Sequence, residues 1–548
     1  MKFVINQIKN FIWYDNFKKS NKKLFTSVYN QKKFKKSEIL IEFNGFQTSH
    51  VPLSYLSNVL ARKYKAEINA FYNYSLISSP LRNTFFNEIK WNIGNFFSLK
   101  NFGIYRSFCV NKILKPKIDK YFEIKIENHF NSIFKKIKKK EDILKIQFDN
   151  VLVGDLIYDT YLKKFVKPTI NINDKNFHQL VKDFLLLYYF WKNYFKIKKV
   201  KAVIGVHTPY SYGLILRLAI YKQIPTYVTS SRFLYFLNKK MPYMHGHFKE
   251  FKKKFLLLDK NLRRKGIISA KKRLKLRFEG IAGAKVDLIS SEKTSFGNKK
   301  YKNLILKSNR KKILIAPHDF FDAVHIYGNT LFPDFYEWLN FLGKISNETN
   351  YDWYIKNRPN FKGKFQRYQP HTNHVIQEII KKYPRIKLLP NEYSHKQIIK
   401  EKIDFVLTCY GSVGVEYPYF NIPVINASIN NPHINYNFNF NPKSKKDYKS
   451  ILKRLNKIKN RKYSKKEIYE YYFMRNIFTD KNWLINDLSK MVKFVGGYDG
   501  MWSSKFYEYW IRHLNIKKHQ NIIKSIENLI ASRENFININ HTKNYHKI

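Results

Sequence analysis

Short apolar runs that alternate with helix-length segments constrain the fold of this chain more than any other feature. In the first half the runs are EILIEFNGF, AEINAFYNY, KAVIGVH and IPTYVTS, at residues 38–46, 66–74, 201–207 and 224–230. Between the first two, Leu53, Leu56 and Val59 follow helical spacing. A strand, a helix and a second strand in this order predict a βαβ unit.

The same alternation restarts in the second half. The apolar runs there are KKILIAPH, YDWYIKN, RIKLLP and DFVLTCYG, at residues 311–318, 351–357, 385–390 and 404–411, with helical patterns between them. Strands joined by helices of this length form parallel sheets with right-handed crossovers. The sequence therefore predicts an α/β protein with two facing Rossmann-like domains, a helical insertion and C-terminal helices.

The predicted boundaries follow from where these patterns stop. The polar stretch at 290–303 lacks periodicity and is the expected join between the domains. We expect an N-terminal extension, a first Rossmann-like domain with a mainly helical insertion, a second Rossmann-like domain, and C-terminal helices with a polar tail, at residues 1–36, 37–295 (insertion about 76–145), 304–470 and 471–548.

The chain is strongly basic. Its 548 residues include 102 Lys and Arg against 40 Asp and Glu, which gives a formal net charge of +62. Such a charge suits nucleic acid, anionic lipid or anionic sugar substrates and does not choose among them. The lysines are spread along the chain, so they also fit an A/T-rich coding bias that raises Lys, Asn, Ile, Phe and Tyr together.

Cysteine content and hydropathy indicate a cytoplasmic protein. Cys109 and Cys409 are too few for a disulfide framework and fit a reducing compartment. Polar residues interrupt the N-terminus before a signal-type apolar region develops. No run approaches the ~20 apolar residues of a membrane-spanning helix. We expect a cytoplasmic chain that can still contact the anionic inner face of a membrane as a peripheral protein.

The stretch DFVLTCYGSVGVEYPYFNIPVINAS, at residues 404–428, predicts a ligand site. Its first apolar run stops before Gly411 and Ser412, and ligands bind at the carboxyl ends of strands in open α/β sheets. Gly411 and Gly414 would let the backbone approach a phosphate, and Ser412 could donate a hydrogen bond. Glu416 could accept hydrogen bonds from sugar hydroxyls. A tight strand-to-helix turn without a ligand would explain the glycines equally well.

Three motifs together resemble a known family. VLTCYGSVGVEYPYFNIPVI, the upstream APHDFFDAVHIYGNTLFPDFYEWL and VLVGDLIYDTYL resemble bacterial capsule and surface-polysaccharide biosynthesis proteins, which are regarded as GT-B glycosyltransferases. The resemblance covers about residues 38–75, 150–235 and 310–430. It implies an acceptor-binding first domain and a second domain that binds a nucleotide-sugar donor, with Ser412 and Glu416 on the donor side. The hexosyl or Kdo class of the transferred sugar stays open.

His318, Lys356 and Arg358 are the other candidates in the second domain. The family usually has Lys-Pro-His-Pro where this chain reads WYIKNRPN, so Asn357 and Arg358 replace the Pro-His pair. Lys356 and Arg358 could still hold donor phosphate oxygens, because a guanidinium offers a bidentate fork. His318 ends a strand and could stabilise phosphate charge or transfer a proton, which makes it a catalytic candidate. It could equally be a loop histidine held by a backbone or carboxylate bond.

Two carboxylates and a histidine are the candidates in the first domain. Asp155 and Asp159 lie four residues apart and can share one face of a helix. Inverting sugar transfer needs a base for the acceptor hydroxyl, and Asp155 is the catalytic candidate for that role. Asp159 and His207 are assigned to the acceptor side. Helix capping by Asp155, a lysine pair for Asp159 and a structural hydrogen bond for His207 are the alternatives.

No cofactor or metal is expected. The HGH and HTNH motifs, at 245–247 and 371–374, have no Cys or carboxylate at a matching metal-ligand spacing. The family resemblance implies sugar transfer without a bound metal, and the chain has no Asp-x-Asp ligand pair.

The leading prediction is a glycosyltransferase that moves a sugar from a nucleotide-sugar to a capsule or other surface-polysaccharide acceptor, which can be lipid-linked. A polyol-phosphate transferase of teichoic-acid type has a related two-domain outline and also uses basic and histidine residues. A non-enzymatic nucleic-acid-binding protein fits the charge, but no zinc-finger spacing or RNP-type aromatic motif accompanies it. No specific nucleic-acid partner is therefore expected.

Overall fold

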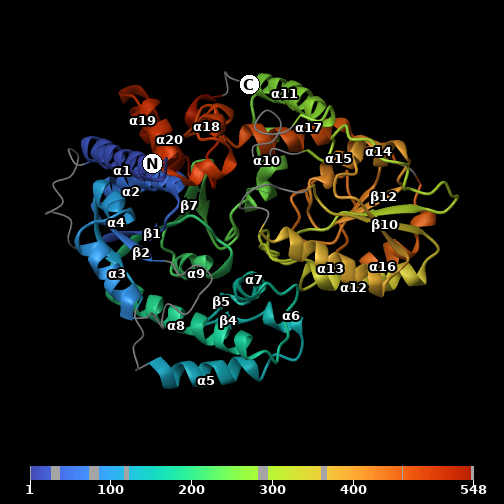
Figure 1. Ribbon diagram of the computed structural model, residues 1–548, viewed down its shortest axis with the longest axis horizontal. Coiled ribbons are helices and arrows are strands. Elements are labelled where there is room, and N and C mark those ends of the chain that lie inside the picture. The colour runs from blue at the N-terminus through green and yellow to red at the C-terminus, as the bar shows by residue number, and fades with distance from the viewer. Residues whose placement is uncertain are drawn as a thin grey trace.

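The computed structural model describes residues 2–25, 37–72, 85–116, 122–281, 294–359, 367–459 and 461–544. Two α/β halves lie side by side, the first blue to green and the second yellow to orange (Figure 1). The last helices, in red, return to the first half.

The first half is built around a six-stranded sheet. Its strands are β1 (Glu38–Phe43), β2 (Glu67–Tyr72), β3 (Val110–Leu114), β6 (Val200–Gly205), β7 (Thr226–Ser230) and β8 (Phe233–Leu237). Their spatial order is β3-β2-β1-β6-β7-β8, and all neighbours pair in parallel except the antiparallel β7 and β8. Counted along this sheet, the order is the doubly wound 3-2-1-4-5-6.

The second half repeats this topology with five parallel strands. They are β9 (Lys312–Ile315), β10 (Asp352–Lys356), β11 (Ile386–Leu389), β12 (Phe405–Thr408) and β13 (Val424–Asn426), in the order β11-β10-β9-β12-β13. The helices that join them are α12 (Phe335–Glu348), α13 (Gln369–Lys382), α14 (His395–Lys400) and α15 (Val413–Tyr419). The order 3-2-1-4-5 is again doubly wound.

Each sheet buries both faces, because side chains alternate along a strand. In β1, Ile39 and Ile41 join one core cluster and Leu40 joins another. In β9, Ile313 and Leu314 are divided in the same way. The cluster that contains Leu40 also contains Ile313, so one core is continuous between the two halves.

The remaining helices cover the sheets and connect the halves. The first half adds α1 (Lys2–Phe25), α2 (Gln47–Tyr64), α3 (Phe85–Phe96), α4 (Asn101–Ser107), α5 (Glu123–Phe134), α6 (Lys140–Ile143), α7 (Gly154–Phe165), α8 (Lys175–Ile197), α9 (Gly213–Tyr221), α10 (Phe251–Leu257) and α11 (Lys260–Phe278). A separate small hairpin consists of β4 (Gln147–Phe148) and β5 (Val151–Leu152). In the second half, α16 (Lys445–Lys453) lies near α12 (Figure 1).

The C-terminal part crosses back to the first half. It contains α17 (Lys465–Phe473), a π-helical turn (Met474–Phe478), α18 (Leu488–Phe494), α19 (Ser504–Arg512), α20 (Ile516–Ser532) and α21 (Ile539–Thr542). Phe506 and Trp510 share a core cluster with Ile39 of β1 and Tyr55 of α2. The final helices are therefore part of the first half's core.

The predicted fold class is confirmed by the two parallel doubly wound sheets. The segment predicted as a mainly helical insertion also contains β3, an edge strand that pairs with β2. Asn111 and Lys112 are exposed in β3, so it lacks the apolar run that marked the other strands. Part of the expected join at 290–303 lies outside the described residues, and the domain boundaries stay predictions.

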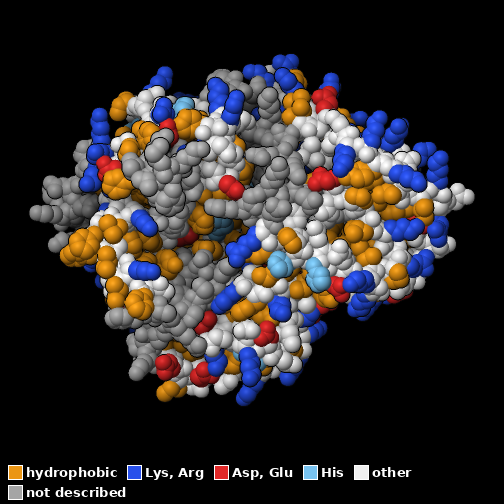
Figure 2. Space-filling model, viewed as in Figure 1, with side chains coloured by type: hydrophobic (Ala, Val, Ile, Leu, Met, Phe, Trp, Pro, Cys, Tyr) orange, Lys and Arg blue, Asp and Glu red, His pale blue; other side chains and the backbone are white. Residues whose placement is uncertain are grey.

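Positive charge is scattered over the surface. Lys and Arg side chains are distributed across the visible face and do not gather into one stripe (Figure 2). This distribution agrees with the coding-bias interpretation of the high lysine content. Within the described ranges, no helix has both the length and the apolar character needed to span a membrane.

Candidate active site

A cavity of about 550 Å³ lies between the two sheets. The first domain lines it with Phe46, which follows β1, and with His207, which follows β6. The second domain lines it with His318, which follows β9, and with Tyr410, which follows β12. β1 and β6, like β9 and β12, are the neighbours at which the strand order reverses. Ligands of doubly wound sheets bind at this point, so one cavity joins the expected binding points of both domains.

His318 is held in the cavity by its neighbours. Its Nε2 lies 3.1 Å from Thr408 Oγ1 and accepts from the backbone N–H of Tyr410 at 3.4 Å. The ring stacks on Phe335 with 4.8 Å between ring centroids. Burial, assisted by the charge of Arg358, lowers the pKa of His318 to about 3, so the ring is neutral at pH 7. Because Nε2 accepts, Nδ1 carries the proton and can donate a hydrogen bond.

Arg358 brings a positive charge to the cavity. Its Nη2 donates to Asp319 Oδ2 at 2.7 Å, and its side chain is 35% exposed. Thr372 Oγ1 donates to Asp319 Oδ1 at 3.1 Å, which fixes the carboxylate. Arg367 lines the same cavity. A guanidinium that is oriented by a carboxylate and open to the cavity can bind phosphate oxygens.

Lys163, Tyr210 and Asp322 bridge the two domains at the cavity. Tyr210 Oη donates to Asp322 Oδ1 at 2.6 Å, and Lys163 Nζ lies 2.9 Å from Tyr210 Oη and 3.3 Å from Asp322 Oδ1. Tyr210 has a φ of 59°, a backbone conformation that side-chain-bearing residues rarely adopt. No sequence motif marks Lys163 or Tyr210, whereas Asp322 lies four residues after His318.

Asp322 is an ionised carboxylate in this bridge. Partial loss of solvent within the cavity would raise its pKa, but Lys163 and the hydrogen bonds from Tyr210 and the Ala323 N–H outweigh that effect and lower the pKa. Its side chain is 68% exposed and lines the cavity. The group can therefore accept a proton or a hydrogen bond from a ligand.

His207 lines the cavity from the first domain. Its ring centroid lies 6.4 Å from that of Phe46 and 5.8 Å from that of Tyr212, and both rings also line the cavity. Partial loss of solvent at the cavity wall, and secondarily the charge of Lys163, lowers the pKa of His207 to about 4. This wall therefore combines aromatic surface with a neutral imidazole at pH 7.

The two carboxylates of α7 lie in the interior rather than in the cavity. Asp155 is 1% exposed, and Arg217 donates to both of its oxygens at 2.5 Å. Burial would raise the pKa of Asp155, but the charge and hydrogen bonds of Arg217 outweigh burial and lower it. Asp155 is therefore the buried ion-pair partner of Arg217 and does not line the interdomain cavity, and its catalytic role stays a prediction.

Asp159, assigned to the acceptor side, pairs with a histidine rather than with the lysine of the alternative. Its Oδ1 lies 2.7 Å from His325 Nδ1, and its Oδ2 accepts from the His325 backbone N–H at 3.1 Å. Both side chains are buried, at 3% and 2% exposed. Because Asp159 lies on α7 and His325 follows β9, this pair joins the two domains.

The Gly-Ser turn after β12 forms as predicted, but its glutamate is already occupied. Glu416 is 1% exposed, and Arg277 of α11 donates to its Oε1 from Nε at 2.8 Å. Arg277 Nη2 also lies 3.5 Å from Ser412 Oγ. Glu416 can meet the hydroxyls of a ligand in this place only after Arg277 has moved.

The two glycines of the turn have different surroundings. A Cβ at Gly414 would lie 2.4 Å from His433 Cε1, so packing against the imidazole requires glycine there. A Cβ at Gly411 would lie 3.6 Å from His318 Cε1, which brings this part of the turn next to the cavity. Pro418 cannot donate to the Gly414 carbonyl, which instead accepts from Asn439 Nδ2 at 2.8 Å.

Lys356 is buried beside this turn. It is 4% exposed, and its Nζ donates to the Asn357 carbonyl at 3.2 Å. Burial lowers its pKa to about 8, against the opposing charges of Glu392 and Glu416. The structure thus brings His207, His318 and Arg358 to the cavity and leaves Lys356 and Glu416 buried next to it.

The histidine motifs do not build a metal centre. Among the described residues, no three His, Cys, Asp or Glu side chains converge as a metal site requires. His245 and His247 of the HGH motif instead line a second cavity that contains several basic residues. The expectation that the protein works without a metal stays a prediction.

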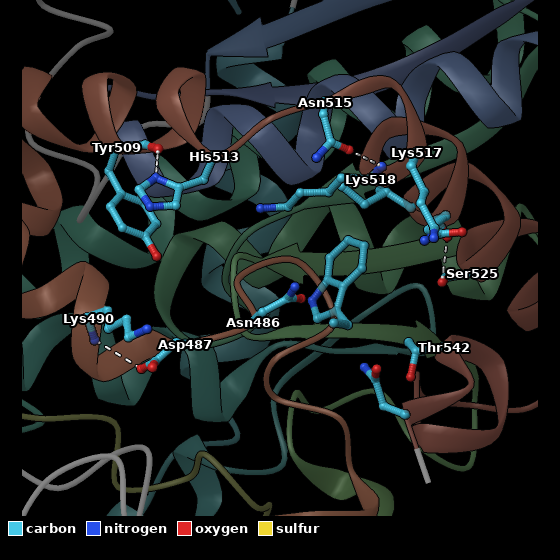
Figure 3. A pocket seen from close by; sticks show the side chains of 14 residues that line it. Asn486, Asp487, Lys490, Tyr509, His513, Asn515, Lys517, Lys518, Ser525 and Thr542 are labelled. Carbon is cyan, nitrogen blue, oxygen red and sulfur yellow. Dashed lines mark hydrogen bonds between the residues drawn. The ribbon is translucent and has the colours of Figure 1, made fainter. Parts of the chain in front are cut away.

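A third cavity lies among the C-terminal helices (Figure 3). It measures about 460 Å³, and Lys490 and Lys518 are among its lining residues. Tyr509 and His513 stack in its wall with 4.1 Å between ring centroids. The carboxylate of Asp487, which also lines this cavity, accepts from the Lys490 backbone N–H at 3.0 Å and so caps α18. The predicted site residues lie elsewhere, which makes the interdomain cavity the candidate active site.

Comparison with known proteins yields structural similarity only. No protein-family model matches the chain, and no curated protein matches it significantly. Similar solved structures include the UDP-GlcNAc 2-epimerase of Methanocaldococcus jannaschii in complex with UDP-GlcNAc and UDP, at 8% identity and a TM-score of 0.24, over 79% of this chain and 97% of that one.

Two further solved structures match at the same level. MurG from Acinetobacter baumannii is 8% identical with a TM-score of 0.18, over 90% of this chain and 99% of that one. A glycosyltransferase from Rickettsia africae is 12% identical with a TM-score of 0.22, over 88% of this chain and 100% of that one. TM-scores this low do not allow the function of these proteins to be assigned to this chain. A function must therefore be argued from the residues of the cavity.

Proposed function

We propose that the chain is a glycosyltransferase that moves a sugar from a nucleotide-sugar donor to a capsule or other surface-polysaccharide acceptor. The observation that carries this proposal is that one cavity is lined by residues from both sheets. These residues follow the strands at which each sheet reverses its strand order. A donor at one reversal point and an acceptor at the other would meet in that cavity. The sequence motifs shared with surface-polysaccharide glycosyltransferases support the choice of reaction.

The second-domain wall suits the leaving nucleotide phosphate. Arg358 and Arg367 line it with guanidinium groups, which bind phosphate oxygens through paired N–H donors. His318 is neutral and offers its Nδ1–H as a further donor. Negative charge grows on the phosphate as its bond to the sugar breaks, so fixed donors of this kind lower the barrier.

Asp322 takes the role of acceptor base in this proposal. It is ionised and exposed in the cavity, whereas Asp155 is closed off by Arg217. The base removes the proton from the acceptor hydroxyl as the oxygen attacks the anomeric carbon, and the nucleotide leaves with the bonding electrons. Tyr210 and Lys163 position the carboxylate through hydrogen bonds to Oδ1.

Ser412 and Glu416 remain the proposed donor-side contacts. The ion pair between Arg277 and Glu416 supports a step in which the donor displaces Arg277 from the carboxylate. Arg277 would then meet the donor's negative charge. Lys356 contributes positive charge from its buried place next to Glu416.

A lipid-linked acceptor would be reached at an anionic membrane face. One face of α3 exposes Phe86 and Phe96, at 72% and 82%, beside Phe97 at 64%. Exposed aromatic side chains on a basic chain favour adsorption to anionic lipid. Sedimentation with phosphatidylglycerol vesicles tests this contact: substitution of Phe86 and Phe96 by Ser should reduce the bound fraction, and unchanged binding would contradict it.

The function is tested by a thermal-shift screen against UDP-, GDP-, CMP- and CDP-linked sugars and against CDP-glycerol. A ligand that binds only the folded protein raises the melting temperature according to its affinity. We expect one nucleotide-sugar class to raise it, Arg358→Gln to weaken that binding about 10-fold or more, and the exposed Arg385→Gln control to leave it unchanged. Stabilisation by CDP-glycerol alone would instead favour the polyol-phosphate transferase, and stabilisation by nucleic acid alone would reject both.

A further inference from the structure

A second cavity adjoins the candidate active site. It measures about 440 Å³ and shares Asp322 and Ile326 with the interdomain cavity. Its walls come from β8, from residues 245–251, from the loop after β9 and from the segment that crosses back after α17. A molecule held here would therefore have one end close to the carboxylate that we propose as the acceptor base.

The second cavity is lined by three cationic side chains from two distant segments. Arg232 lies in the turn between β7 and β8, while Arg475 lies in the π-helical turn and Lys481 follows it. Among the described residues that line this cavity, Asp322 is the one acid, and Lys163 already offsets its charge.

Several donors in this cavity lack a hydrogen-bond partner. Arg232 Nη1 donates to Tyr498 Oη at 3.1 Å, but its buried Nε and Nη2 have no partner. Nδ1 of His247 is also buried without a partner, in a side chain that is 5% exposed. Buried donors and acceptors left unsatisfied cost stability, and such atoms mark places where a ligand completes the bonding.

Burial and the excess of positive charge in this cavity lower the pKa values of its two histidines, His245 and His247. Burial, then the charges of Arg475, Lys481 and Arg232, lowers the pKa of His245 to about 3. Burial lowers the pKa of His247 as well, and the charges of Arg475 and Lys481 contribute. The positive charges of Arg232, Arg475 and Lys481 would repel a metal cation here and attract an anion.

We propose that this second cavity binds the phosphate or pyrophosphate group of the acceptor, with Arg232, Arg475 and Lys481 as its ligands. That the bound molecule is the acceptor rests on the proposed function, whereas the anion site itself rests on the cavity alone. Guanidinium groups bind phosphate through two parallel hydrogen bonds, and the unpartnered Nε and Nη2 of Arg232 form one edge of such a fork. The bound phosphate would hold the acceptor so that its hydroxyl reaches Asp322.

Isothermal titration of the full chain at constant ionic strength tests the proposal. The probes are inorganic pyrophosphate, geranyl pyrophosphate as a lipid-linked phosphate and glucose 1-phosphate as a soluble one. The variants are Arg232→Gln and Lys481→Gln in the second cavity, Arg358→Gln in the first, and Arg264→Gln as an exposed control on α11. Thermal melting establishes that each variant is folded.

We expect Arg232→Gln and Lys481→Gln to weaken binding of the best phosphate probe about 10-fold or more, because each removes a charged hydrogen-bond donor. Arg264→Gln should leave the affinity within about two-fold, as an exposed charge contributes little. Arg358→Gln should reduce nucleotide-sugar binding but leave phosphate-probe binding within the same limit. Tighter binding of geranyl pyrophosphate identifies a lipid-linked source, and tighter binding of glucose 1-phosphate a soluble one.

The failures of the two proposals are distinguishable. Phosphate probes that bind the Arg232→Gln protein as tightly as the wild type, or that bind no form of the protein, overturn the anion site even if nucleotide-sugars bind normally. Nucleotide-sugars that bind nowhere, while Arg232→Gln abolishes pyrophosphate binding, leave the anion site intact and reject the glycosyltransferase.

Discussion

The two sheets share one strand order but end in different side chains. At the first sheet's reversal point, Phe46, His207 and Tyr212 form a wall of rings that is uncharged at pH 7. On the second sheet's side, Arg358 after β10 and its partner Asp319 after β9 bring charge to the cavity. Equivalent backbone frames therefore present different chemistry, and the residues that follow each strand decide which ligand group each domain can take.

The same contrast separates the acidic residues. Asp155 on α7 is 1% exposed and closed off by Arg217, whereas the Asp322 side chain after β9 is 68% exposed. Four-residue spacing placed Asp155 and Asp159 on one helix face, but that face is turned toward the interior. Exposure to the cavity, rather than spacing along a helix, distinguishes the carboxylate that can act on a ligand.

The largest expected effect comes from Asp322→Asn. Loss of the proposed base should lower kcat by about 10²- to 10⁴-fold, while nucleotide-sugar affinity stays within about two-fold because Asp322 does not bind the donor. Steady-state kinetics with the donor found by thermal shift, together with direct binding, measures the split. Asp15→Asn, at an exposed lysine pair on α1, is the control. A kcat close to that of the wild type would exclude Asp322 as the base.

The sheets could be predicted from their apolar runs. Much of the candidate site could not be predicted, because its residues pair with partners far away in the sequence. The main strands carry short apolar runs because both faces are buried, so β1, β6, β9 and β12 could be placed from the sequence. His207 and His318 were found because they follow such strands. Arg277 and Glu416 are 139 residues apart, so their pairing leaves no local signal. The hydrogen bond between Tyr210 and Asp322, 112 residues apart, leaves no local signal for the same reason.

Asp155→Asn tests the structural side of the comparison. Removing one partner of a buried ion pair leaves Arg217 uncompensated, and we expect a loss of about 3 kcal/mol in the free energy of unfolding at pH 7. Denaturant titration measures it, with Asp149→Asn at the exposed Lys192 pair as a control that should lose less than about 1 kcal/mol. A stable but inactive Asp155→Asn protein would return Asp155 to the active site and break the comparison.

The pH dependence of this loss has a defined sign. The folded-state pKa of Asp155 is lowered, so its ion pair contributes fully above the unfolded pKa of about 3.9 and is lost as the pH falls through the folded pKa. The stability difference between wild type and Asp155→Asn should therefore be constant from about pH 7 to pH 5 and shrink below about pH 4. A difference that shrinks between pH 7 and pH 5 would contradict the assignment to Asp155.

The smallest effect sharpens the contrast between the two walls. His207→Phe keeps an aromatic ring in the first-domain wall but removes its nitrogen atoms, so the loss of one neutral hydrogen bond should raise the KM for acceptor by about 2- to 10-fold. Nucleotide-sugar affinity should not change, since the donor is assigned to the opposite wall. Initial rates at varied acceptor and saturating donor measure the first quantity, and calorimetry the second. If His207→Phe weakened donor binding instead, the donor would extend across the cavity, and the division of labour between the two sheets would fail.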